Sequence, residues 1–408
     1  HKVLSLDDVL AGVQRAYLAK AQGEAAVFPL VFHDFSPRAA DMDIKSGHLG
    51  SEGVFGLKLV SFFEGNIQRG QAPLSALVAL FSDETGQPLA VLEGSTLTGL
   101  RIGAAAALGA KCLARKNSEV LLVVGAGHQC VYQVGAMLRA VPTVRRVLLH
   151  DAKSPENARA KAAALPGALE QELSVNAAGV SIEPAPNLAA AVSQSDIVVT
   201  ATPSYRPLVQ AAWVRPGTHF SCVGADLAGK QELDGSILAG ARVYTDDTPQ
   251  CLAVGEVEMA VKQGFLTPGG IAGELGQVLA GQKPGRIKEE DVTVFDTTGI
   301  ALQDLAAAAC ALRRAEALWC GCEKRRNTMK IRDFGVEMWM NAYENNCTYN
   351  LAETCVKSLT VQELAGLSGK GDKVWEDIRA MQLTYGDIEG SAALREGLCG
   401  LYETVRPE

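Results

Sequence analysis

Over residues 1–110 the hydrophobic positions recur with helical spacing in some stretches and with strand spacing in others, which predicts a mixture of helices and strands. Ser5 and Asp8 have the spacing of a capping box, so we expect a helix that begins there and ends near Ala21. The other elements expected in this part are strands at 54–63, 74–81 and 88–92, a turn at 83–86, and an alanine-rich helix at 95–115.

From Glu119 to Phe295 the pattern changes to a repetition of strand, turn and helix. Val120–Val124 is a continuous apolar run, which is typical of a parallel strand covered on both faces. This alternation predicts an α/β fold with a Rossmann-type, doubly wound parallel sheet. The further elements expected here are helices at 129–140 and 155–165 and strands at 146–151, 197–200 and 218–223.

A glycine-rich turn lies directly between the first of these strands and its helix. Gly125 permits the tight turn, and Gly127 allows the backbone to approach a pyrophosphate at the N-terminus of the helix. Cys130 stands where a third small residue is usual. The context favours a dinucleotide-binding site over a glycine turn without a ligand.

Asp151 closes the next predicted strand, 24 residues after Gly127. A carboxylate at this point accepts hydrogen bonds from the adenosine ribose and repels a 2′-phosphate, which favours NAD over NADP. Lys153 nearby leaves NADP open as an alternative.

Length, charge and cysteine content restrict the class of protein. A chain of 408 residues is long enough for two or three domains. Its net charge of -8 offers no basic surface for nucleic acid, and no apolar run is long enough to cross a membrane. The 10 cysteines are scattered without a zinc pattern, so we expect no metal site and free thiols in a reducing cytoplasm. His1 is an unusual first residue, so we expect the native chain to begin earlier.

Four stretches together resemble the ornithine cyclodeaminase/mu-crystallin family over about residues 1–318. They are Gly56-Leu-Lys58-Leu-Val, Thr85-Gly-Gln-Pro-Leu-Ala with Leu97-Thr-Gly-Leu-Arg101, Val223-Gly-Ala-Asp226 with Gly229-Lys-Gln-Glu-Leu233, and Phe295-Asp-Thr-Thr-Gly-Ile-Ala301. The resemblance implies a substrate-binding and dimerisation lobe of α+β type at 1–115 with 296–320. An NAD-binding domain at 116–295 is inserted in it, and the protein is expected to form a homodimer.

Three cations of the first lobe, Lys58, Arg101 and Arg38, are suited to hold a substrate carboxylate. Lys58 lies in an apolar strand, where an unpaired ammonium is costly. The alternative is that Lys58 extends to solvent and Arg101 is an ordinary helix cation, and for Arg38 the two interpretations are about equal.

Asp226 follows an apolar strand at its carboxyl end, where ligands bind in open α/β sheets. The matching family residue is the catalytic acid/base; the alternative is a helix N-cap. We expect Asp226 and Lys58 to be catalytic and Arg38, Lys45, Lys58, Arg101 and Thr298 to bind substrate. Residues expected to bind the cofactor are Gly125, Gly127, His128, Gln129, Asp151, Thr200, Thr202, Val223, Gly224, Lys230 and Thr297.

Two departures from the family pattern bear on the substrate. The usual Arg-Thr pair is Arg101-Ile102 here, so a hydroxyl near the cofactor is missing. Lys45 stands where ornithine cyclodeaminases carry an acidic residue for the distal amine. This predicts an NAD-dependent amino-acid dehydrogenase or imine reductase for a small or acidic amino, imino or oxo acid. A cyclodeaminase and a non-catalytic ligand-binding protein are the alternatives.

Residues 321–328 are expected as a charged linker, and 329–408 resemble the first part of a fold-type-I aminotransferase. The stretches that carry this resemblance are Phe334-Gly-Val-Glu-Met-Trp, Tyr349-Asn-Leu-Ala-Glu-Thr, Leu383-Thr-Tyr-Gly-Asp387-Ile-Glu-Gly-Ser391 and Leu394-Arg-Glu-Gly. The expectation is a truncated fusion, with the missing remainder of that enzyme as a possible partner. A helical extension used for contacts is the alternative.

Overall fold

The structure is a computed structural model that describes residues 4–36, 39–319, 359–380 and 391–401. The chain divides into two compact units, His1–Lys324 and Arg325–Glu408. The first unit contains two lobes, each built on one sheet.

A six-stranded antiparallel sheet forms the first lobe, with strand order β1-β3-β4-β5-β6 and β2 paired to β3. The capping box predicted at Ser5 is confirmed, because its hydroxyl accepts from the backbone N–H of Asp8 at the start of helix α1. The elements of this part are α1 (Leu6–Ala21), β1 (Ala25–Val27), β2 (Val31–Ser36), β3 (Ala40–Leu49), β4 (Val54–Phe63), β5 (Leu74–Ser82), β6 (Pro88–Glu93) and α2 (Gly94–Leu113).

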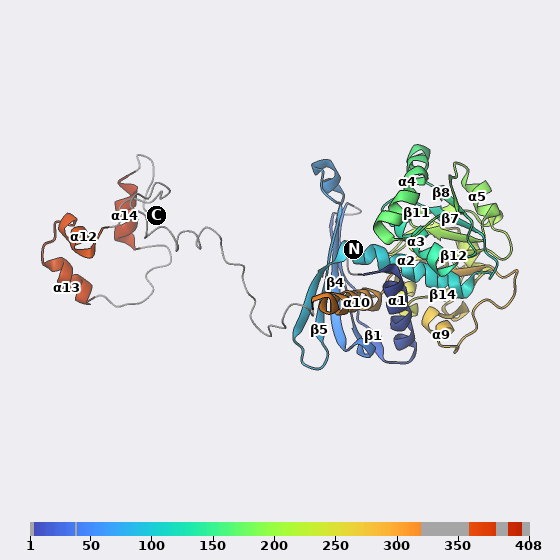
Figure 1. Ribbon diagram of the computed structural model, residues 1–408, viewed down its shortest axis with the longest axis horizontal. Helices are drawn as coiled ribbons and strands as arrows, with labels where there is room; N and C mark the ends of the chain where they lie inside the picture. The colour runs from blue at the N-terminus through green and yellow to red at the C-terminus, as the bar shows by residue number, and fades with distance from the viewer. Residues whose placement is uncertain (1–3, 37–38, 320–358, 381–390, 402–408) are drawn as a thin grey trace. The chain divides into compact units, whose positions relative to one another are not determined.

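Helix α10 (Ala301–Trp319) follows the last strand of the second lobe in the chain. It packs on β3 and β4 of the first lobe, beside α1 (Figure 1). The helix lies very close to the sheet at Gly56, where an added Cβ would be 2.9 Å from Leu305. Gly47 of β3 lies against Leu302 in the same way. The face of the sheet that carries Lys45 and Lys58 is therefore covered by the segment that follows the second lobe.

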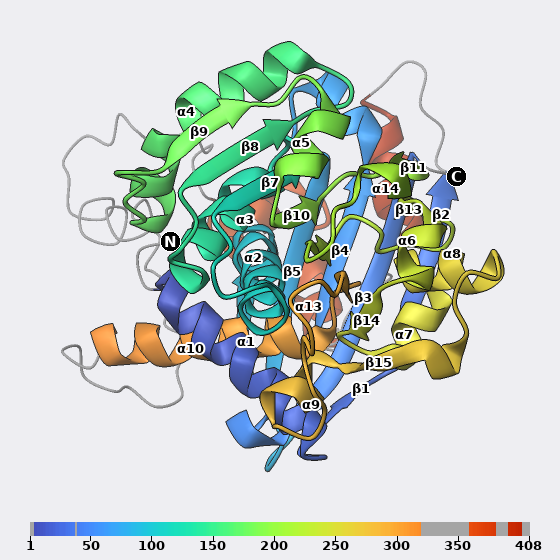
Figure 2. The same cartoon turned by 90° about the vertical axis from the view of Figure 1, so that its right-hand side faces the viewer.

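The second lobe is an eight-stranded parallel sheet, in the order β15-β14-β16-β12-β10-β7-β8-β9 (Figure 2). Its inner strands are buried on both faces, so Leu121 and Leu122 of β7 belong to different cores. Helices α2, α3 and α4 cover one face, and α5, α6 and α8 cover the other. The strands are β7 (Val120–Val124), β8 (Arg146–His150), β9 (Ser181–Pro184), β10 (Ile197–Thr200), β12 (His219–Cys222), β14 (Arg242–Thr245), β15 (Ile271–Glu274) and β16 (Thr293–Asp296). The predicted doubly wound α/β fold is confirmed.

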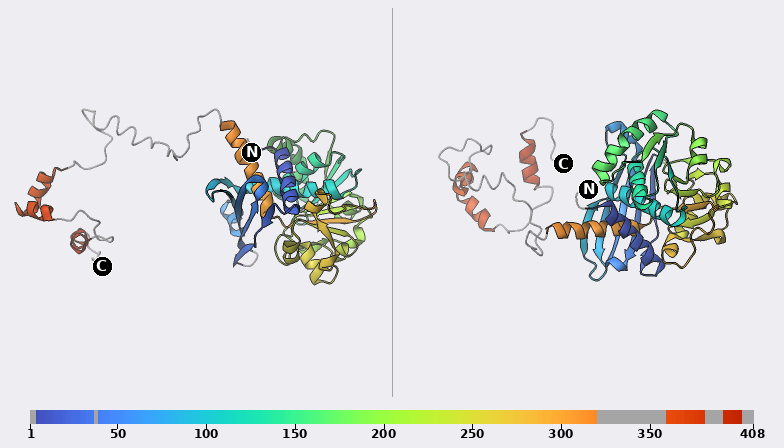
Figure 3. Two further views of the ribbon diagram at one scale, coloured as in Figure 1. Left: turned by 90° about the horizontal axis from the view of Figure 1, so that it is seen from below. Right: turned by 45° about the vertical axis from the view of Figure 1, so that its right-hand side comes forward.

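Helix α2 joins the lobes, since it packs against β5 of one sheet and β12 and β16 of the other. Figure 3 shows the two lobes side by side from two further directions. A Cβ on Gly99 would be 2.5 Å from the ring of Tyr132, so the glycine lets α2 approach α3. The remaining elements of the lobe are α3 (Gln129–Ala140), α4 (Pro155–Leu173), α5 (Leu188–Gln194), β11 (Tyr205–Val209), β13 (Gln231–Leu233), α6 (Gly235–Ala239), α7 (Thr248–Ala253), α8 (Glu256–Lys262) and α9 (Leu275–Leu279).

Helix α4 is longer than expected. The sequence pattern placed its end at residue 165, before Pro166, but the helix continues to Leu173. Proline inside a helix costs about 3 kcal/mol, whereas each fully buried leucine contributes about 1.5–3 kcal/mol. Leu165, Leu169 and Leu173 are all buried, so tertiary packing outweighs the local signal.

The described part of the second unit is helical, as predicted, with α12 (Val361–Leu367), α13 (Lys373–Ala380) and α14 (Ala392–Cys399). The predicted linker and most of the aminotransferase-like motifs lie outside the described residues. In the part of the chain that the structure describes, every helix is too short or too polar to cross a membrane.

Candidate functional site

The glycine turn has the geometry that a nucleotide site needs. Gly125 has φ 117°, and its N–H donates to the carbonyl of His150 at 2.8 Å. A Cβ there would be 2.5 Å from the oxygen of Ala201, so only glycine fits. A Cβ on Gly127 would meet nothing within 4 Å, so this backbone is open to a ligand.

Helix α3 begins directly after this turn. Its cap residue is His128, whose side chain makes no capping hydrogen bond within the described chain. Instead, its ring packs edge-on at 5.3 Å from the ring of Tyr132. The N–H of Cys130 donates to the carbonyl of Gly127 at 3.2 Å, and because no side chain in the described part of the chain caps this helix, its N-terminus can receive an anion. Gln129 adds a buried Oε1 with no hydrogen-bond partner among the described residues.

Asp151 lies just beyond β8, beside the turn. Its Oδ1 accepts from the backbone N–H of Lys153 at 2.9 Å and of Ser154 at 3.2 Å, and its Oδ2 accepts from Asn157 at 2.6 Å. Desolvation opposes ionisation, but these hydrogen bonds outweigh it and lower the pKa of Asp151. The carboxylate is therefore held in place and negatively charged.

A cavity of about 210 Å³ lies between the two lobes, at the carboxyl ends of β10 and β12. Ligands bind at this edge of open α/β sheets. From the first lobe the cavity is lined by Asp43, Lys45, Lys58, Val60, Leu74, Thr98, Arg101 and Ile102; from the second it is lined by Gln129, Ala201, Thr202, Pro203, Val223, Gly224, Asp226 and Lys230.

Two buried lysines stand side by side on the wall of this cavity. Lys45 on β3 is directly opposite Lys58 on β4 in the antiparallel register. They are 6% and 2% exposed, and like charges so placed are destabilising. Lys45 donates to the carbonyl of Thr298 at 2.8 Å, which satisfies one of its three donors.

Arg101 joins the two lysines from α2. Its Nε donates to Asp304 at 3.0 Å and its Nη1 donates to Gln303 at 2.7 Å, both on α10. Asp304 also lies 3.6 Å from the ammonium of Lys58 and is fully buried. One carboxylate thus holds two of the three cations in place and leaves the group positively charged.

Burial, assisted by the neighbouring Arg101, lowers the pKa of Lys58 to about 8. Desolvation disfavours the ammonium, and Asp304 only partly compensates. An anionic ligand in the cavity would favour the charged form of Lys58. The alternative that Lys58 extends to solvent does not agree with its burial.

Asp226 enters the cavity from the loop after β12, with its side chain 46% exposed. Its Oδ1 accepts from Lys230 at 2.6 Å. Desolvation raises the pKa of Asp226, but Lys230 and Lys45 outweigh this and lower it. No helix follows directly: the next one, α6, is capped by Asp234. The helix-cap interpretation of Asp226 is therefore wrong.

Comparison with known proteins decides the family. The model of the ornithine cyclodeaminase/mu-crystallin family matches residues 1–317. The chain belongs to this family. The resemblance inferred from its motifs is confirmed for that part.

Three solved structures share the family fold at a TM-score of 0.70. An archaeal alanine dehydrogenase, a dimer with bound NAD, is 37% identical, and the match covers 78% of this chain and 93% of that one. A Δ1-pyrroline-2-carboxylate reductase from Thermococcus litoralis, in complex with NADH and L-proline, is 28% identical, with 78% and 95% covered. The iminosuccinate reductase of Paracoccus denitrificans, in complex with NAD+, is 31% identical, with 78% and 94% covered.

Within this family member, a buried glutamate connects the two loops that line the cavity. Oε1 of Glu232 accepts from both the backbone N–H and the hydroxyl of Thr202 at 2.7 Å, and its Oε2 accepts from the N–H of Gly224 at 3.1 Å. Burial raises the pKa of Glu232 to about 7 despite these hydrogen bonds. Glu232 therefore fixes the spacing of the loops after β10 and β12.

Three threonines predicted for the site are buried next to the cavity and are not among the residues that line it. The hydroxyl of Thr297 donates to Asp246 at 2.8 Å, and that of Thr298 accepts from Gln250 at 2.7 Å. Thr200 is fully buried at the end of β10. Arg38 lies outside the described residues.

Sequence reasoning missed four residues of the site, and each has a physical explanation. Asp304 and Glu232 act through partners that are distant in sequence or in another loop, so no local pattern marks them. Thr98 precedes Arg101 by one helical turn, and its buried hydroxyl has no hydrogen-bond partner among the described residues. Thr98 therefore supplies a hydroxyl close to Ile102, the position where the family usually has a threonine. Asp43 shares a face of β3 with Lys45, a signal visible from strand periodicity.

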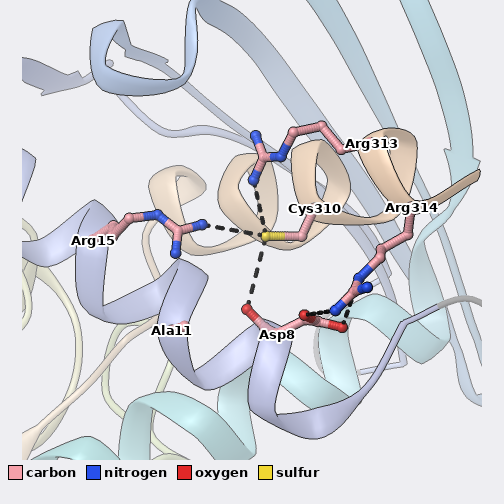
Figure 4. A pocket seen from close by; sticks show the side chains of 6 residues that line it. All are labelled: Asp8, Ala11, Arg15, Cys310, Arg313 and Arg314. Carbon is pink, nitrogen blue, oxygen red and sulfur yellow. Dashed lines mark hydrogen bonds and ion pairs between the residues drawn. The ribbon is translucent and has the colours of Figure 1, made fainter. Parts of the chain in front are cut away.

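A second cavity, of about 170 Å³, lies where α1 packs against α10 (Figure 4). The sulfur of Cys310 accepts hydrogen bonds from Arg313 at 3.2 Å and from Arg15 at 3.5 Å. These arginines also pair with Glu52, and Arg314 pairs with Asp8. The guanidinium groups thus already have protein partners, and they hold the two helices together.

Proposed function

We propose that this protein is an NAD-dependent oxidoreductase that interconverts a small or acidic α-amino acid with its imino or oxo acid. The observation that carries the proposal is the group of three buried cations, Lys45, Lys58 and Arg101, in one cavity with the carboxylate of Asp226. Around this cavity the four cations Lys45, Lys58, Arg101 and Lys230 outnumber the three carboxylates Asp43, Asp226 and Asp304 by one, so an anionic ligand would balance the charge. The α-carboxylate of an amino acid is such an anion.

NAD fits the residues present. Gly125, Gly127 and the start of α3 would hold the pyrophosphate, and Asp151 the adenosine ribose. Gln129 and Thr202 line the cavity where the nicotinamide end would lie. When bound, NAD supplies the acceptor for hydride. The NAD- or NADH-bound structures of the three relatives support this assignment.

The chain's own groups orient the substrate and manage its proton. The carboxylate is held by Lys45, Lys58 and Arg101, and this contact places the α-carbon inside the cavity. Asp226 is ionised at neutral pH because its pKa is lowered, so it accepts a proton from the substrate nitrogen or from an attacking water. Lys230 keeps one oxygen of Asp226 fixed and leaves the other for this task.

The test is turnover with NAD and a panel of alanine, glutamate, ornithine and lysine. A dehydrogenase produces NADH stoichiometrically, which is followed at the absorbance of the reduced nicotinamide. Ammonia release without net NADH would indicate a cyclodeaminase instead. Binding of NAD with no reaction on any amino or imino acid would indicate a ligand-binding protein.

We expect NAD to bind more tightly than NADP, because the fixed negative charge of Asp151 faces the ribose end of the site. Calorimetric titration of both cofactors checks this. Asp151→Ser should narrow the difference, while Lys153→Ser, on the same loop, should not. A preference of the wild type for NADP would contradict the role of Asp151.

The affinity for an oxo acid should fall as pH rises through about 8. The pKa of Lys58 is lowered to about 8, so its charge is present below this pH and lost above it. Pyruvate has no group that titrates in this range, so its affinity for the enzyme–NADH complex, measured by NADH fluorescence, should fall by up to about tenfold per pH unit above 8. Lys58→Met should bind weakly at every pH. A pH profile that is identical in wild type and Lys58→Met would contradict this role.

Homodimer formation is part of the proposal. The sheet face opposite Lys58 carries one apolar cross-strand row, formed by Val31, Ile44, Leu59 and Leu77. Val31 and Leu77 are exposed, and Ile44 and Leu59 between them are partly buried. Val91 of β6 is 72% exposed. A patch of this kind marks an interface, and the archaeal alanine dehydrogenase is a dimer.

Two further assignments complete the proposal, one from the sequence and one from the cysteines. The resemblance of residues 329–408 to the start of an aminotransferase supports a fusion in which one enzyme supplies an amino or oxo acid to the other. The described cysteines have free thiols, which supports a reducing cytoplasm.

A further inference from the structure

The cavity contains a second carboxylate, Asp43, for which the mechanism above has no use. It lies on β3 two residues before Lys45, so both side chains share one face of the sheet and both line the cavity. Its Oδ1 is buried and accepts no hydrogen bond from any described residue. Leaving a charged acceptor unpaired costs free energy, so this oxygen indicates a ligand with a donor group.

The neighbouring cations do not satisfy Asp43. Lys45 donates to the carbonyl of Thr298, and Lys58 lies against Asp304. Burial raises the pKa of Asp43; Lys45 and Lys58 oppose this, and Asp226 and Asp304 add to it. The carboxyl group is thus surrounded by charges of both signs without a hydrogen bond to any of them.

We propose that Asp43 binds the nitrogen of the substrate and selects α-amino acids over α-hydroxy acids and simple carboxylates. The inference rests on the proposed function. An amino acid carries a carboxylate and an ammonium group on one carbon. The wall of the cavity carries the complementary charges, with Lys45 and Lys58 for the carboxylate and Asp43 beside them for the ammonium. Asp226 moves the proton, and Asp43 holds the nitrogen while it does so.

The competing explanation is that Asp43 only balances the charge of the lysines. The two explanations predict opposite results for an amino acid, and a carboxylate without nitrogen serves as the reference. If Asp43 binds nitrogen, its removal weakens the binding of an amino acid but not the binding of a carboxylate without nitrogen. If it balances charge, its removal leaves a more positive cavity that binds every carboxylate more tightly, the amino acid included.

The experiment compares L-alanine with propionate, which has the same carboxylate and no nitrogen. Both are titrated into the complex of the full-length enzyme with NADH, and binding is followed by NADH fluorescence. Asp43→Asn should weaken alanine about 10- to 100-fold, as expected for a charged hydrogen bond, and should not weaken propionate. Asp43→Glu, which keeps the carboxylate, should recover part of the preference for alanine.

Asp41→Asn is the matched control, since Asp41 lies on the same face of β3, two residues earlier, and is not among the residues that line the cavity. It should leave both affinities unchanged. Unchanged NADH affinity shows that each variant is folded. An equal change in the affinities for alanine and propionate in Asp43→Asn would overturn the role of Asp43 but not the proposed function. A wild-type enzyme that binds NADH but no amino acid would overturn the proposed function as well.

Discussion

Asp226→Asn is expected to reduce turnover by about 10²- to 10⁴-fold while leaving cofactor affinity largely unchanged. The amide keeps the size of the side chain and can still accept a hydrogen bond from Lys230, but it cannot accept a proton. Asp226 lines the cavity from a loop without helical structure, so the change removes no helix cap. The measurement is steady-state NADH production with the best amino acid of the panel, together with calorimetric titration of NAD.

The matched control for this variant is Asp234→Asn. Asp234 is eight residues away and does cap a helix, since its side chain accepts from the N–H of Ser236. It should cost some stability and little activity. If Asp226→Asn turns over like the wild type, Asp226 is a structural residue and the proton must pass through another group.

The second large effect concerns the choice of substrate. We expect ornithine to be a poor substrate, because its distal ammonium would have to approach the ammonium of Lys45. Two like charges a few ångströms apart repel by roughly a few kcal/mol at an effective dielectric near 20, and each ~1.4 kcal/mol is a factor of ten in binding. Asp43 offsets only part of this, since Lys58 lies directly opposite Lys45.

Comparison of kcat/KM for alanine, glutamate, lysine and ornithine in wild type and Lys45→Glu tests this prediction. Because all four substrates share the α-carboxylate that Lys45 helps to hold, the informative quantity is the ratio of kcat/KM between substrates. The variant should shift this ratio towards the diamino acids and away from glutamate. Lys45→Met separates the loss of repulsion from the gain of attraction, and it should give an intermediate result. Efficient conversion of ornithine to proline by the wild type would contradict the argument and favour a cyclodeaminase.

The prediction of elements succeeded where the signal was local. The strand at Val120–Val124 and the helix at Gln129–Ala140 have the predicted bounds. A buried parallel strand must be apolar throughout, and a turn with positive φ needs glycine, so both features are visible in a few consecutive residues. Helix α4 shows the limit, because the local stop signal at Pro166 is weaker than the burial of the leucines around it.

The sequence by itself determined the glycine turn, the fold class and the candidates Lys58, Arg101 and Asp226, since these depend on residue type and spacing over short stretches. Only the tertiary structure placed Lys45 opposite Lys58, because that pairing depends on the antiparallel register of β3 and β4. Only the tertiary structure brought Asp304 to Arg101, 203 positions away. Buried charges are paired by the packing of distant segments, which no local pattern records, and this packing decides the electrostatics of the site.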